Sequence, residues 1–259
     1  MQRKRIFALF LTISMVLIMG CLSGCSSEKV TGKGNMVKRP YDVGSFDSVE
    51  IKKANNSSGA VSFFGLGSDF EIIYKNGQEN KVELEAQENL FDYIQVRVEA
   101  GTLILENSQP IKTDDKKRPK LYVTMPQFNK LTVHGGAYFK DADKIQGEKF
   151  DIDVSGFCEM DLDLDVNSFG IKLSNDGTVK LRGSAKSAKI DLSGIGKIEA
   201  KNLDTVDADV NIGGMGDCEI SCSGTLKANA SDGGTLRYKG DPELTENNSG
   251  ILGTIEKVN

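Results

Sequence analysis

The chain has 259 residues, of which 39% are hydrophobic, and its 37 acidic and 32 basic residues give a formal net charge of -5. This balance offers no basic surface for nucleic acid, so we expect no nucleic-acid partner. Once an apolar leader is set aside, roughly 200 residues remain, enough to bury one substantial core as a single domain.

Residues 1–25 have the layout of a secretory signal, with basic residues at positions 3–5 before a largely apolar run, Ile6–Met19. The run is shorter than the roughly 20 residues of a spanning helix. It ends in Leu22-Ser23-Gly24-Cys25, which resembles the lipobox of bacterial lipoproteins, whose cysteine receives a diacylglycerol and becomes the mature N-terminus. We therefore expect lipidation at Cys25 and anchoring to a membrane. The alternatives are Cys21 as acceptor, an ordinary cleaved signal, or an uncleaved anchor helix.

Residues 26–40 carry Gly32, Gly34 and several polar residues without periodicity, which predicts a flexible tether. Strand-like segments with alternating or β-rich character follow up to Asn129. They are Phe46–Ile51, Phe70–Tyr74, Lys81–Ala86, Tyr93–Val98, Leu103–Glu106 and Leu121–Met125. Between the first two lies a Gly-rich loop, residues 59–67, whose Phe63 and Phe64 could form a contact surface or a cap.

From Leu131 to Tyr238 one pattern recurs, in which a small turn separates two strands that alternate apolar with polar residues. The turns open 21, 19, 19, 20 and 18 residues apart, at His134, Ser155, Ser174, Ser193, Gly213 and Ser231. A period of about 20 residues with this alternation predicts an all-β, parallel β-helix-like solenoid with one repeat per rung. We place the solenoid at residues 41–242, with a more irregular N-terminal half, and a C-terminal tail or cap at 243–259.

Alignment of the turns predicts columns of side chains that stack between rungs. The inward column is Val179, Ile198, Cys218 and Leu236, and the outward column is Lys140, Asp161, Lys180, Glu199, Glu219 and Arg237. Four of the five outward steps join opposite charges, and only the step from Glu199 to Glu219 joins like charges. A glycine that recurs at 177, 196, 216 and 234 indicates a positive φ or a crowded corner. Val206 and Leu226 are candidates for a third, less regular strand.

The cysteines beyond the leader, Cys158, Cys218 and Cys222, are expected to be free thiols. In the predicted stack Cys158 and Cys218 lie three rungs apart, about 14 Å, which exceeds disulfide reach. Cys218 and Cys222, on one extended strand, would be about 13 Å apart. We expect Cys218 to be a buried apolar residue.

Three sequence patterns could each form a chemical site. The acids at 151, 153, 161, 163 and 165 could form a carboxylate pair on an outward face, although alternate acids are also what the solvent sides of two strands look like. Gly213-Gly214-Met215-Gly216-Asp217 resembles a calcium-binding nonapeptide, but its aspartate comes one residue early, and a turn is the alternative. His134, the single histidine, could serve as a base, or could occupy the turn position that serine fills elsewhere. We therefore assign no catalytic, cofactor or metal-binding residue.

Several segments form a recognisable series when they are taken in order. They are Gly44–Val49, Gly101–Leu105, Leu121–Pro126, the turn Ser193–Gly196 and the closing Gly234–Pro242. In this order they resemble the bacterial family described as the head GIN domain of putative autotransporter adhesins. The resemblance covers roughly Asp42 to Pro242. It implies a right-handed β-helix-like fold and export to the bacterial envelope, and it supplies no catalytic or ligand residues.

These features together favour a non-enzymatic envelope lipoprotein whose solenoid binds a cell-surface protein or glycan. Its expected location is extracytoplasmic and lipid-anchored. One alternative is a carbohydrate-active β-helix enzyme that uses outward acids such as Asp161 and Asp163. The other is a structural or regulatory envelope protein without an external ligand. The sequence leaves the oligomeric state open.

Overall fold

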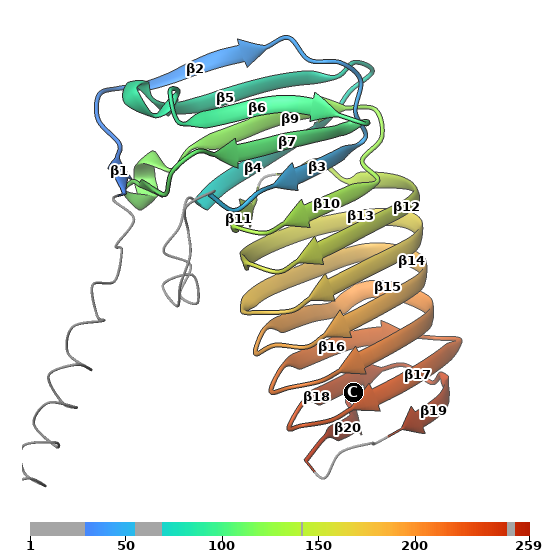
Figure 1. Cartoon of the computed structure of the whole chain (residues 1–259). Coiled ribbons are helices and arrows are strands. Elements are labelled where there is room, and N and C mark those ends of the chain that lie inside the picture. Colours follow the sequence, from blue (N-terminus) through green and yellow to red (C-terminus); the bar gives the residue numbers. More distant parts are fainter. Residues whose placement is uncertain (1–28, 55–68, 141, 248–251) are drawn as a thin grey trace, which may run out of the picture.

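The structure is a computed structural model, and it describes residues 29–54, 69–140, 142–247 and 252–259. The fold is all-β, and its parallel strands stack into a β-solenoid of about 6 turns with about 19 residues per turn (Figure 1). The predicted fold class is therefore confirmed. Within the described residues no helix has the length and apolar character needed to cross a membrane.

The N-terminal half holds short strands and two single-turn 3-10 helices. They are β1 (Val30–Thr31), β2 (Met36–Tyr41), β3 (Ser48–Ile51), β4 (Asp69–Asn76), β5 (Lys81–Gln87), η2 (Glu88–Leu90), β6 (Ile94–Glu99), β7 (Thr102–Asn107), β8 (Ile111–Lys112), η3 (Asp115–Lys117) and β9 (Lys120–Met125).

The regular half is a run of parallel strands. They are β10 (Lys130–Val133), β11 (Gly136–Phe139), β12 (Ile145–Val154), β13 (Phe157–Leu173), β14 (Gly177–Leu192), β15 (Lys197–Ile212), β16 (Asp217–Cys222), β17 (Thr225–Ala230), β18 (Thr235–Lys239), β19 (Glu243–Asn247) and β20 (Thr254–Lys257).

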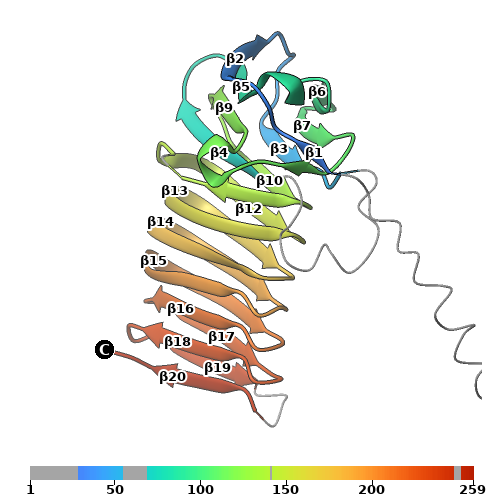
Figure 2. The ribbon, with the colours of Figure 1, turned by 90° about the vertical axis from the view of Figure 1, so that its left-hand side faces the viewer.

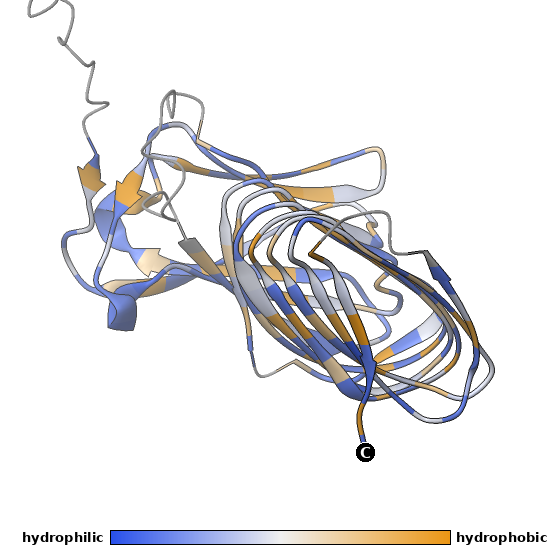
Figure 3. Ribbon diagram, turned by 90° about the horizontal axis from the view of Figure 1, so that it is seen from below, coloured by the Kyte–Doolittle hydropathy of each residue, from blue (hydrophilic) through white to orange (hydrophobic). Residues whose placement is uncertain are grey.

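The solenoid has two broad sides and two narrow edges (Figures 1 and 3). We call the side built on β10, β12 and β17 the β10 face, and the side built on β11, β16 and β18 the β11 face. Each of β13, β14 and β15 starts on the β11 face and bends within the strand onto the β10 face. That bend forms one narrow edge, the bend edge. The short turns that return the chain from the β10 face to the β11 face form the other, the turn edge.

The predicted turn openings lie on the turn edge, and their backbone amides bind the rung before them. The amide of Ser155 donates to the carbonyl of Val133 at 2.9 Å, and that of Ser193 to Leu173 at 2.9 Å. His134, Ser174, Gly213 and Ser231 make the equivalent bond, at 2.7 to 2.9 Å. These bonds fix each turn to the rung before it, and they give the turn amides the backbone partners that they would otherwise lack.

The predicted inward column is confirmed residue by residue. Val179, Ile198, Cys218 and Leu236 are in register on successive rungs, and each side chain is 0% exposed. Ile255 of β20 continues the column by one further rung. Alternate residues of these strands therefore form one continuous apolar core.

The third-strand prediction is half right. Leu226 is 0% exposed and belongs to the core, whereas Val206 is 49% exposed and points outward. The inward residues at this bend are Leu203 and Thr205. Alternation counted back from the buried residues Ala208 and Val210 would place Val206 inward, but at the bend two consecutive residues, Val206 and Asp207, face outward.

The recurrent corner glycines are explained by crowding. Gly216 has no positive φ, but a Cβ added to it would lie 2.5 Å from the Cδ2 atom of Leu192. At Gly234 an added Cβ would lie 2.4 Å from Cγ2 of Ile212. The turns therefore pack so closely on the core that only hydrogen fits at these positions.

The N-terminal half is interleaved with the regular half. β3 lies between β7 and β10, and β4 lies between β9 and β11, all in parallel register. Beyond them the parallel order ends, because β6 pairs antiparallel with β7, and β5 pairs antiparallel with both β9 and β2. These antiparallel strands close the N-terminal end of the stack (Figures 1 and 2).

Two expected boundaries require correction. β1 and β2 fall inside the expected tether, residues 26–40, yet they pair with β8 and β5, so the chain joins the folded domain at Val30. At the other end, residues 243–257 pair as β19 and β20 with β17 and β18. This segment is a further rung of the solenoid, so it closes the stack as a strand pair in continued register.

Candidate functional site

The outward side of the β11 face carries a column of charged side chains that runs along the solenoid. The register is Asp161, Lys180, Glu199, Glu219 and Arg237, followed by Glu256 on the last rung. From Asp161 onward the predicted column is thus in the predicted order. Lys140 differs, because its ammonium binds Glu159 at 2.8 Å, while Asp161 pairs with Arg182.

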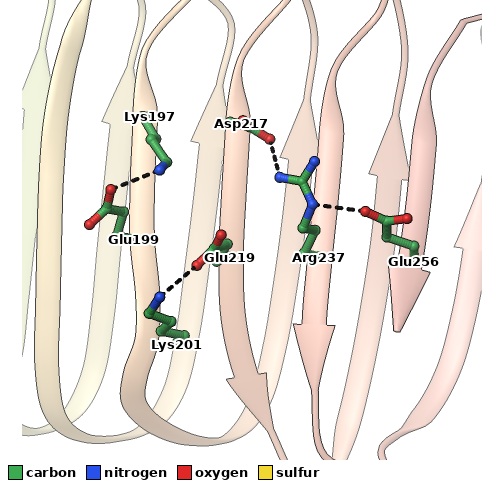
Figure 4. A network of polar contacts seen from close by, with 7 residues as sticks. All are labelled: Lys197, Glu199, Lys201, Asp217, Glu219, Arg237 and Glu256. Atoms are coloured by element: carbon green, nitrogen blue, oxygen red, sulfur yellow. Dashed lines mark hydrogen bonds and ion pairs between the residues drawn. The ribbon is translucent and has the colours of Figure 1, made fainter. Parts of the chain in front are cut away.

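The like-charged step in this column is relieved by neighbouring lysines (Figure 4). Lys197 binds the carboxylate of Glu199 at 2.8 Å, and Lys201 binds that of Glu219 at 3.5 Å. The hydrogen bond from Lys197 holds the pKa of Glu199 below its ordinary value. Lys197, Glu199 and Lys201 are two residues apart and lie on the same side of the strand, so each of the two glutamates has a lysine of its own.

Arg237 links three rungs at the C-terminal part of the column. Its guanidinium binds Asp217 through Nη1 at 2.9 Å and Glu256 through Nε at 2.8 Å (Figure 4). Asp217 is the aspartate of the calcium-like turn sequence, and its carboxylate is therefore engaged by a guanidinium. Across the described part of the chain no three metal-ligating His, Cys, Asp or Glu side chains come together.

A β-bulge opens a hollow in this face. Lys180 is opposite Glu199 and Arg182 is opposite Asn202, so β15 has one residue more than β14 in this interval. The resulting hollow has a volume of about 140 Å³. Its lining is Asp161, Lys180, Leu181, Arg182, Glu199, Lys201 and Asn202.

The polar groups of the hollow differ in how far they are already paired. Arg182 binds Asp161 and lies 3.6 Å from the Asp163 carboxylate, and Lys201 binds Glu219. Among the described residues, the Lys180 ammonium has no carboxylate within 4 Å, although its charge helps to lower the pKa of Glu199, and the Asn202 side-chain amide has no hydrogen-bond partner. Because both residues line the same hollow, they offer an anion-binding group beside a group that can both donate and accept hydrogen bonds.

The five acids that could form a carboxylate pair do not all lie on one face. Asp151 and Asp153 lie in β12 on the β10 face, whereas Asp161 lies on the β11 face. Asp161 and Asp163 both contact the single guanidinium of Arg182, and Asp163 also binds Lys144 at 3.3 Å. A glycosidase needs one carboxylic acid and one carboxylate facing an open sugar site, and this pair instead shares cations.

His134 does contact two groups suited to a catalytic triad, which the sequence pattern did not reveal. Its Nδ1 lies 2.8 Å from the Ser155 hydroxyl, and its Nε2 lies 3.5 Å from the Glu50 carboxylate. The amides of Ser155, Gly156 and Phe157 all donate to carbonyls of the preceding rung. They cannot also stabilise an oxyanion, so the arrangement is a polar ladder along the turn edge.

The three described thiols are free, as expected, and all three are buried, whereas burial was predicted for Cys218 alone. Burial raises the pKa of Cys158 to about 12, and it raises those of Cys218 and Cys222 as well. They are therefore protonated and unreactive at neutral pH. Cys25, Cys21, Phe63 and Phe64 lie outside the described residues.

Comparison with known proteins identifies the family. The family model "Putative auto-transporter adhesin, head GIN domain" matches residues 65–242, more than half of the chain. The chain belongs to this family. No curated protein matches it.

Solved structures similar to this GIN-domain chain share its fold. A putative adhesin from Bacteroides fragilis has 21% identity and a TM-score of 0.72, with 88% of this chain and 100% of that chain covered. A putative lipid binding protein from Parabacteroides distasonis has 21% identity and a TM-score of 0.67, with 90% and 100% covered. A putative adhesin from Parabacteroides merdae has 17% identity and a TM-score of 0.60, with 90% and 100% covered.

Proposed function

We propose that this GIN-domain chain is a lipid-anchored, extracytoplasmic adhesin of the bacterial envelope, which binds a surface glycan through the hollow on its β11 face. Membership of a family of putative adhesins supports an adhesin-like role without catalysis. The lipobox-like sequence that ends at Cys25 supports the anchor.

The observation that carries the ligand class is that, among the described residues, Lys180 has no carboxylate within 4 Å and the Asn202 side-chain amide has no hydrogen-bond partner at the bulge. The Lys180 ammonium can bind a carboxylate or sulfate, and the Asn202 amide can bind sugar hydroxyl groups. The hollow of about 140 Å³ is smaller than the roughly 300–1,000 Å³ of a drug-sized pocket. It therefore suits one acidic sugar unit of a longer chain, with neighbouring units lying along the face.

Removing the Lys180 charge and the Asn202 side-chain amide tests whether the hollow binds the glycan. In the full chain, Lys180→Gln combined with Asn202→Ala should weaken binding to uronic-acid-containing polysaccharides by roughly 10- to 100-fold, the value of one or two charge-assisted hydrogen bonds. Glycan arrays and titration calorimetry would measure this. Lys227→Gln, the same exchange at an exposed lysine of the β10 face, is the matched control.

Equal binding by the double variant and the control would contradict a site in the hollow. Turnover of a glycan that Asp161→Asn and Asp163→Asn abolish, in a chain that stays folded, would support the enzymatic alternative. Binding to envelope proteins, with no binding to any glycan, would show that the ligand is a protein and would contradict the proposed glycan.

A further inference from the structure

The turn edge carries most of the exposed large apolar side chains. Four such residues occur among the described ones, namely Ile195 at 56%, Val206 at 49%, Met215 at 72% and Leu252 at 72% exposure. Three of them, Ile195, Met215 and Leu252, lie at the turn edge, and Val206 lies at the bend edge. Apolar side chains that gather on one narrow edge mark an interaction surface.

The three residues occupy one column. Each stands two places before a strand residue in register, Lys197, Asp217 and Thr254 respectively. The intervening rung has Gly233 at this position, and a Cβ there would lie only 3.6 Å from Cγ of Met215. The Met215 side chain therefore lies over the glycine, and the apolar column is continued across the rung that lacks a side chain.

The chain enters the folded domain on the same edge. β8 and η3 lie in the connection from β7 to β9, which crosses from the β10 face to the β11 face as the other turns do. β1 pairs with β8, and the amides of Val30 and Gly32 donate to the carbonyls of Pro110 and Lys112 at 2.8 and 2.9 Å. Figures 1 and 2 show β1 at this end of the turn edge.

Little chain separates this entry point from the proposed lipid. Val30 is five residues after Cys25, which spans about 17 Å at most when fully extended. The domain is then held near the bilayer at its turn edge. Residues 30–36 do not form a free stalk between the domain and the bilayer, because β1 pairs with β8 and the backbone amide of Lys33 donates to the Asn89 side chain at 2.6 Å.

Basic side chains surround the entry point. Lys33, Lys112, Lys116 and Lys117 are exposed there. The nearby acids are Glu88, Asp114 and Asp115, and Asp115 binds Arg118 at 3.0 Å. Farther along the turn edge, Asp176 occupies the position of this column on the rung before Ile195, and Asp232 precedes Gly233. The excess of positive charge therefore lies at the anchored end, where each lysine adds about 1 kcal/mol of attraction to anionic headgroups.

We propose that the turn edge rests on the surface of the anchoring bilayer, with Lys112, Lys116 and Lys117 on anionic headgroups and Ile195, Met215 and Leu252 in the interfacial layer. The solenoid then lies along the membrane, and both broad faces stand free. This orientation rests on the lipid anchor of the proposed function. To that anchor it adds a second, weaker contact between the turn edge and the bilayer.

Depth-dependent fluorescence quenching tests the orientation. The chain contains no tryptophan, so Met215→Trp and, as the matched control on the bend edge, Val206→Trp each give a single reporter. The full chain, made with its leader in a bacterial host that can process and acylate it, would be added to vesicles of phosphatidylcholine with phosphatidylglycerol that contain brominated lipids. We expect a blue shift and at least about twofold stronger quenching for Met215→Trp than for Val206→Trp, since interfacial side chains reach roughly 5–10 Å into the bilayer.

A separate set of variants tests the contact between the lysines and the anionic headgroups. Reversing the charge of Lys112, Lys116 and Lys117 should reduce the quenching of Met215→Trp in anionic vesicles, whereas the same reversal of Lys172, Lys189 and Lys227 on the β10 face should leave it unchanged.

The outcomes separate the two proposals. Vesicle-bound protein with equal quenching at both positions overturns the orientation and leaves the anchor standing. Protein that stays in solution overturns the anchor, and the orientation with it.

Discussion

At the scale of single residues, the structure separates glycines that relieve crowding from those that hold an unusual torsion. Gly183 combines both, because its φ is +102° and an added Cβ would lie 2.0 Å from the backbone oxygen of Leu164. Neither a rotamer change nor a side-chain shift can relieve contact with a backbone atom of a buried rung. The sequence pattern did not single out this position, since its equivalent in the next rung is Leu203.

Gly183→Ala should therefore lower the free energy of unfolding by at least about 2 kcal/mol, from the strained torsion and the contact together. Gly44→Ala is the control, because nothing lies within 4 Å of an added Cβ there, and its effect should be below about 0.5 kcal/mol. Urea unfolding of both variants would measure the difference. A similar loss in both would show that the rungs are not closely packed at Gly183.

At the scale of strands, alternation and turn spacing were sufficient to predict which side chains share a column. Ile198 and Cys218 lie where the period places them, because parallel strands in register repeat the in-and-out pattern of the rung above. The bend was harder to predict, since a strand that turns a corner interrupts the alternation, and Val206 was misplaced for this reason. The extra residue of the bulge, which creates the hollow, makes the step from Ser193 to Gly213 20 residues long, one more than the step before it. The spacing does not tell where in the rung this residue lies.

Two isoleucines of one turn region give a matched test of this column. Ile198 is 0% exposed and Ile195 is 56% exposed. Ile198→Ala should cost about 2–5 kcal/mol of stability, because it leaves a cavity between Val179 and Cys218. Ile195→Ala should change stability by less than about 0.5 kcal/mol. Thermal and chemical unfolding would show whether the two losses differ; equal losses would contradict the assigned facing.

At the scale of the whole molecule, the two ends of the solenoid are unlike. Antiparallel strands close the N-terminal end, and β2 bears Lys38, Arg39 and Pro40, which discourage further pairing. β19 and β20 end the other side, and within the described ranges each pairs with one strand only. Leu244 and Ile255, the apolar residues of this last rung, are only partly buried.

Stability in a stacked array depends on nearest neighbours, so the last rung should open first. Hydrogen exchange followed by mass spectrometry should find β19 and β20 the least protected strands, with β13, β14 and β15 the most protected. β6 and β7 provide the comparison at the closed end. Equal protection at both ends would indicate that the solenoid opens only as a single unit.

The position of β3 between β7 and β10 also sets an order of assembly. A strand made early in synthesis has no neighbour on either side until residues 102–105 and 130–133 have followed it. The rungs from β13 onward can then be added one after another, each on a finished template. The first half must therefore be made almost completely before β3 and β4 have both of their neighbours. In a chain that crosses a membrane N-terminus first, β3 can pair with β7 and β4 with β9, and each strand then has one open side until β10 and β11 follow.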